Sequence, residues 1–69
     1  MIETIGIAAG EIWKFLGKQE QPVTLSTLRK NLSLSSTLLM MGLGWLAREG
    51  KINIEMPKDS YSYRISLKR

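Results

Sequence analysis

The side chains best suited to binding another molecule lie close together, between Ser35 and Gly50. Hydroxyl and guanidinium groups at the two ends of this segment could bond to the bases or phosphates of DNA. These candidate nucleic-acid contacts are Ser36, Thr37 and Arg48. The middle of the segment is apolar and contains Trp and Met, which are enriched in protein interfaces. The candidate interface residues there are Met40, Met41, Gly44 and Trp45.

Side chains for covalent or metal chemistry are nearly absent. The chain has no His and no Cys, and its one Asp is Asp59 in a predicted turn. General acid–base catalysis, nucleophilic catalysis and thiolate zinc binding therefore lack their usual groups. No glycine-rich phosphate loop follows a predicted strand. We predict no catalytic residue, no metal site, no cofactor and no small-molecule ligand, and a protein that is not an enzyme.

The net charge of +4 is compatible with a polyanionic partner, but ten basic and six acidic residues are interleaved along the chain. Lys58 and Arg64, near the C-terminus, are further candidate phosphate contacts, together with Lys68 and Arg69. About four neutralised phosphates would give weak, strongly salt-dependent DNA binding without sequence preference. The alternative is that these charges only solvate the surface.

A length of 69 residues predicts one domain over residues 1–69, near the lower size limit for a single core. An amphipathic helix is expected over residues 4–16, with Gly17 ending it as a left-handed residue. The absence of cysteine, of a signal sequence and of a membrane-spanning apolar run makes a cytoplasmic location the default and gives no reason to expect membrane association.

The rest of the chain predicts two more helices and a hairpin. Val23 is expected to form a short strand, and Thr24 to cap a helix that buries Leu25, Leu28 and Leu32. Ser35 or Ser36 caps a third helix that ends at Gly50. Apolar and polar residues then alternate over residues 51–56 and 61–67, on either side of a turn at 57–60. The inner face of this hairpin is expected to comprise Ile52, Ile54, Met56, Tyr61, Tyr63, Ile65 and Leu67.

This order of elements predicts an α+β fold, a winged helix-turn-helix domain with three helices and a C-terminal β-hairpin wing. Two motifs support it: the run from Leu43 to Ile52, LGWLAREGKI, and the first-helix segments Ile5-Gly6 and Ala9–Trp13. They resemble a family of short, stand-alone prokaryotic winged helix-turn-helix proteins of unassigned function. The resemblance implies the fold, a soluble prokaryotic setting and homodimers, and it carries over no catalytic or ligand residues.

The third helix has a defined phase because Leu43, Leu46, Gly50 and Ile52 match the end of a winged-helix recognition helix. Its core-facing residues are then Leu39, Gly42, Leu43 and Leu46. The apolar residues on the opposite side predict a homodimeric interaction module, and mid-helix Gly44 suggests the close approach of a backbone. Two alternatives stay open: Trp45 and Met41 fill the core of their own domain, or the helix reads DNA as a transcriptional regulator does. Gly6 and Gly10 leave a groove on the first helix for the third helix or for a partner.

Overall fold

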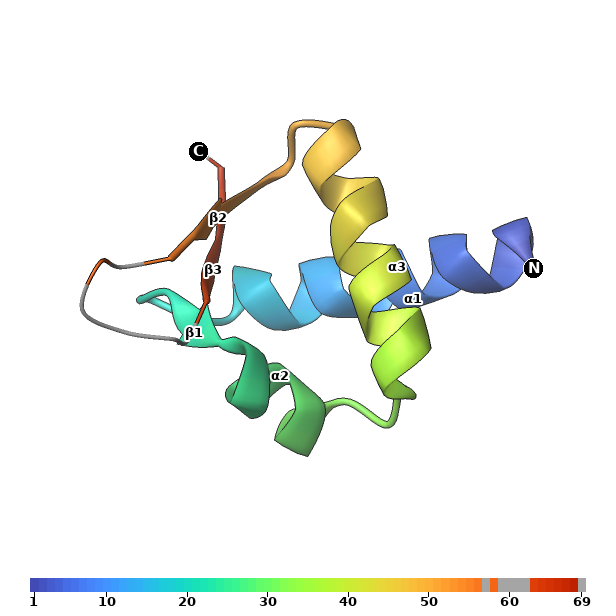
Figure 1. The fold of residues 1–69 in the computed structure, drawn as a ribbon, viewed down its shortest axis with the longest axis horizontal. Helices are drawn as coiled ribbons and strands as arrows, with labels where there is room; N and C mark the ends of the chain where they lie inside the picture. The colour runs from blue at the N-terminus through green and yellow to red at the C-terminus, as the bar shows by residue number, and fades with distance from the viewer. Residues whose placement is uncertain (57, 59–62, 69) are drawn as a thin grey trace.

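The computed structural model describes residues 1–56, 58 and 63–68 of the chain. It contains three helices and a small antiparallel sheet (Figure 1), which confirms the predicted α+β class. The elements are α1 (Ile2–Gly17), β1 (Val23–Thr24), α2 (Leu25–Asn31), α3 (Ser36–Arg48), β2 (Ile52–Glu55) and β3 (Arg64–Leu67). The predicted turn at 57–60, apart from Lys58, and the predicted position of Tyr61 lie outside the described residues.

Helix α1 starts two residues earlier than predicted and ends differently. The prediction of a left-handed Gly17 is wrong, because Gly17 is the last helical residue and Lys18 follows it at φ −90°. The helix ends instead in a tightened turn. The N–H groups of Lys18 and Gln19 donate to the carbonyls of Phe15 and Leu16, both at 3.1 Å. These bonds satisfy C-terminal carbonyls without a left-handed residue.

Side-chain caps start α2 and α3. Thr24 Oγ1 accepts a hydrogen bond from the Thr27 N–H at 3.2 Å, as predicted for the second helix. At α3 the structure selects Ser35, whose Oγ accepts from the Leu38 N–H at 3.1 Å. Gly50 follows α3 at φ 71°, the left-handed conformation that a glycine adopts at low cost. The chain therefore turns from α3 into β2 where the sequence predicted it.

The sheet has the order β1-β3-β2, so the last strand in the sequence is the central one. Val23 of β1 and Ile54 of β2 both pair with Ile65, from opposite sides of β3. The short strand predicted at Val23 is thus present and closes the sheet over the helices. Ile65 is the central apolar residue of this sheet and is almost fully buried.

Helices α1 and α3 make the most extensive contact in the fold, and Gly42 lies at its centre. A Cβ built at Gly42 would lie 2.8 Å from Ile12 Cδ1 and 3.2 Å from the backbone nitrogen of Ala9. All four residues predicted to face the core from the third helix are buried. The buried apolar residues are Ala8, Ala9, Ile12, Leu16, Val23, Leu28, Leu39, Leu43, Leu46, Ile52 and Ile65.

The inner face of the hairpin is only half covered. Ile52 and Ile65 are buried and Leu67 is partly buried, as the alternation predicted. Burial of Ile54, Met56 and Tyr63 was also expected, and this is wrong because all three are exposed. These residues lie on the part of the hairpin nearest its turn, while Ile52 and Leu67 pair at the other end of the strands. The described helices cover only that second end.

Candidate interaction surface

The outward side of α3 is an exposed apolar surface. Met40 is 53% exposed and Trp45 is 38% exposed, and Met41 and Gly44 also lie at the surface. Residues three and four apart on a helix are neighbours, so these four positions form one continuous strip. Neither Trp45 nor Met41 is among the buried core residues of its own domain. The strip lies opposite the helix face that carries buried Leu39, Leu43 and Leu46.

Trp45 lies at one edge of this strip and packs on α1. A Cβ built at Gly6 would be 3.9 Å from Trp45 Cζ2, so the indole ring rests on the surface left open by that glycine. At Gly10, a built Cβ meets no atom of the described residues within 4 Å, outside the helix's own local backbone. The groove predicted at Gly6 and Gly10 thus receives a ring from α3 at Gly6 alone, and the close approach of the two helices is at Gly42.

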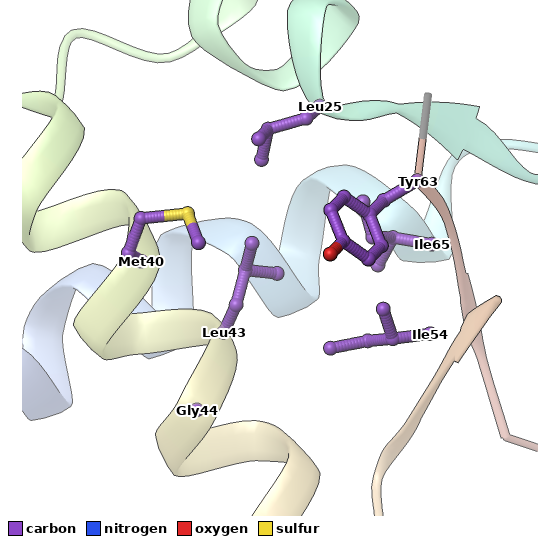
Figure 2. Close-up of a pocket in the computed structure, with 7 residues that line it drawn as sticks. All are labelled: Leu25, Met40, Leu43, Gly44, Ile54, Tyr63 and Ile65. Carbon is purple, nitrogen blue, oxygen red and sulfur yellow. The ribbon is translucent and has the colours of Figure 1, made fainter. Parts of the chain in front are cut away.

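A groove lies along the other edge of the strip, between α3 and the hairpin. Its volume is about 240 Å³, and Figure 2 shows side chains from α3, α2 and both hairpin strands around it. The described residues that line it are Leu25, Met40, Leu43, Gly44, Ile54, Tyr63 and Ile65. None of them carries a charge. The Tyr63 ring points into the groove, and its hydroxyl is the one polar side-chain group that Figure 2 shows there.

Sequence reasoning missed this groove because it assigned Ile54 and Tyr63 to the buried face of the hairpin. One signal was available. The predicted second helix runs only from its cap at Thr24 to Leu32, which is about two turns, and a helix that short covers little of a sheet. The observed α2 has seven residues and fully buries only Leu28. The groove is the space that this short helix leaves uncovered.

Gly44 opens directly onto the groove. A Cβ built there meets no atom of the described residues within 4 Å beyond its own helical turn, and its φ is not positive. Neither the space around it nor its backbone conformation requires glycine, although glycine in a helix costs about 1 kcal/mol relative to alanine. Gly42, two residues earlier, is required by the packing of α1. The two glycines of α3 therefore serve different purposes.

The candidate DNA contacts are all exposed but do not form one surface. Those on α3 are Ser36, Thr37 and Arg48, and those on the hairpin are Lys58 and Arg64. Ser36 and Arg48 are at opposite ends of α3, about 18 Å apart at the helical rise. Arg64 pairs in register with Glu55, which places opposite charges on neighbouring strands. Among the described aromatic rings, Trp13 has a cation above it, the Lys51 ammonium at 5.9 Å from the ring centroid.

A helix-turn-helix unit followed by a two-stranded wing defines the class of this protein as winged helix-turn-helix. The chain belongs to the winged helix-turn-helix domain family DUF2582, whose family model matches residues 1–66. This confirms the resemblance to a short stand-alone winged helix-turn-helix family. Domains with this fold often bind DNA. No curated protein and no solved structure matches the chain. None of the described helices has both the length and the apolar character to cross a membrane.

Proposed function

We propose that this protein is a homodimeric interaction module in which the outward side of α3 forms the contact between two copies. The observation that carries the proposal is the continuous exposed strip of Met40, Met41, Gly44 and Trp45. A recognition helix that reads DNA presents side chains that bond to base edges, such as Arg, Asn or Gln. The middle of this helix presents none of these and carries thioether and indole groups instead, which favour protein contact.

The exposed apolar area supplies most of the minimum area that a dimer interface requires. Met40, Met41, Trp45, Ile54 and Tyr63 each expose about two fifths to one half of their surface. At about 200 Å² for each whole residue, they expose on the order of 400 Å² per copy. Two copies would bury roughly 800 Å² through these residues, and a specific interface needs at least about 1,000 Å² in total. Thr37 and Arg48 lie on the same side of α3 and would supply the remainder.

Met40→Lys tests this proposal. The long stem of the lysine can lie where Met40 lies while its ammonium group stays in water, so the monomer is expected to fold normally. In a dimer the ammonium would be buried without a partner. We expect the dissociation constant of the dimer to rise at least tenfold, which corresponds to about 1.4 kcal/mol. Size-exclusion chromatography with light scattering across a concentration series measures it.

Ile7→Lys is the matched control, since Ile7 is an apolar residue of α1 that is 67% exposed and lies outside the α3 strip. We expect this variant to change the dissociation constant less than twofold. A parent protein that remains monomeric at high concentration would contradict the proposed function. An equal rise in the dissociation constant of the dimer for both variants would show that the effect is general charge repulsion. That result would contradict the placement of the interface on α3.

DNA binding is a second candidate function, favoured by the fold class and by the exposure of Arg48 and Lys58. The charges are few and well separated, so binding to mixed duplex DNA would be weak and lost as salt rises. We expect measurable binding at about 50 mM salt and a reduced salt dependence in Arg48→Ala. A fluorescence anisotropy titration at two salt concentrations measures both. Binding that is absent at low salt, or unchanged by the substitution, argues against DNA as a partner.

A further inference from the structure

The two edges of the outward side of α3 have different shapes. Along one edge, Met40 and Gly44 border the groove toward the hairpin. Along the other, Trp45 packs on α1 at Gly6 and keeps 38% of its surface exposed, with Met41 one turn before it. Figure 1 shows the hairpin on one side of α3 and the N-terminal half of α1 on the other. We call these the groove edge and the Trp45 edge.

A symmetric dimer can bring two such faces together in two ways. A two-fold axis that crosses α3 at a right angle makes the two α3 helices antiparallel and places each edge on its own counterpart. A two-fold axis that runs along α3 makes the helices parallel and places the groove edge of one copy on the Trp45 edge of the other. Both arrangements satisfy the rule that the same patch is used by both copies.

Only the parallel arrangement places Trp45 over the groove. Antiparallel helices would bring groove against groove, leaving apolar space unoccupied, and Trp45 against Trp45. An apolar cavity of about 150 Å³ is large enough to bind benzene, so the groove of about 240 Å³ has room for one large side chain. The missing side chain at Gly44, for which the described residues give no intrachain reason, lets a ring approach the α3 backbone.

We propose that two copies associate through parallel α3 helices, with the exposed part of Trp45 of the partner subunit covering the groove beside Gly44. This arrangement rests on the proposed homodimer and specifies its geometry. It also makes the hairpin residues Ile54 and Tyr63 part of the contact. The two Arg48 side chains lie on the same side of the dimer. Their stems lie in the contact while their guanidinium groups remain in water, where interactions between exposed charges are worth only about 0–1 kcal/mol.

Site-specific cross-linking distinguishes the two arrangements, because the chain has no natural cysteine. Thr37 and Arg48 are exposed residues near opposite ends of α3, about 16 Å apart along its axis. In a parallel dimer each residue lies near its own counterpart. In an antiparallel dimer that crosses midway, Thr37 of one copy lies near Arg48 of the other, and like residues are separated by about 16 Å.

The experiment treats Thr37→Cys, Arg48→Cys and an equimolar mixture with a short bismaleimide and measures covalent dimer by denaturing electrophoresis. We expect each variant alone to give a major covalent dimer band. Ser26→Cys, at an exposed position of α2, gives the background of random collisions. Light scattering on the reduced variants establishes that each is dimeric before the reagent is added.

Each outcome has a separate meaning. Covalent dimers that form only in the mixture would establish antiparallel helices and overturn this inference, while the proposed homodimer would stand. Dimeric variants that give only the Ser26→Cys background, alone and mixed, would overturn both the inference and the assignment of the interface to α3. Reduced variants that are monomeric while the parent is dimeric would support the assignment of the interface to the side of α3 that carries Thr37 and Arg48. A monomeric parent protein would overturn the homodimer itself.

Discussion

Leu28→Ala is expected to lower the free energy of unfolding by about 2–5 kcal/mol, the usual cost of truncating a fully buried leucine. Leu28 has no exposed surface and is the one buried residue of α2. A domain of 69 residues is stabilised by roughly 3–10 kcal/mol in total. The substitution would therefore remove a large part of the stability and detach α2 from the core. Urea unfolding followed by circular dichroism, at a concentration where the protein is monomeric, measures it.

Leu38→Ala is the matched control for this prediction. It deletes the same atoms from a leucine of α3 that is only partly buried and lies outside the core cluster. We expect Leu38→Ala to lower the free energy of unfolding by less than half as much as Leu28→Ala does. Equal losses at the two positions would mean that burial of Leu28 does not anchor α2, contrary to the packing described above.

Gly42→Leu is expected to prevent native packing of α1 against α3. The first added carbon already falls 2.8 Å from Ile12 Cδ1 and 3.2 Å from the Ala9 backbone nitrogen. Ile12 has no exposed surface and so has no room to move aside. Overpacking of a core costs about 1–3 kcal/mol for a few methylene groups, and a leucine side chain at the point where two backbones meet would cost at least the upper value. Urea unfolding and thermal melting measure the loss.

Gly10→Leu makes the same substitution on α1 at a position where no described atom lies within 4 Å of a built Cβ, outside the local helix. Leucine is a better helix former than glycine, so we expect the free energy of unfolding of this variant to rise by up to about 0.8 kcal/mol. The two substitutions are therefore expected to change the free energy of unfolding in opposite directions. A Gly42→Leu protein as stable as the parent would show that α1 and α3 do not approach each other as described.

The sequence predicted most of the fold because local signals agreed with one another. The helix caps at Thr24 and Ser35 lie directly before apolar residues with helical spacing, and Gly50 marks the change to a spacing of two. These signals depend on backbone chemistry within a few residues, so a short window of sequence contains them. The leucines of α3 also established which side of the helix is buried, and that prediction is confirmed.

The contacts between elements were predicted less well. The periodicity of a helix tells which side faces a neighbour but not where along the axis two helices cross. The sequence therefore suggested a groove for the third helix at Gly6 and Gly10, and the structure places the close approach of the two backbones at Gly42. In the same way, alternation along the hairpin indicated which face is apolar. It did not indicate that the helices stop short of Ile54 and Tyr63, because that depends on the lengths and angles of three packed helices.

The strand order β1-β3-β2 has a consequence for the newly made chain. Both β1 and β2 pair only with Arg64–Leu67 among the described residues, so neither strand has a partner until the last strand has left the ribosome. Helices form from neighbouring residues and can appear during synthesis, whereas contacts between distant residues come later. The apolar residues Val23 and Ile54 thus have no sheet partner until Arg64–Leu67 has been synthesised, and this one segment then pairs with both strands.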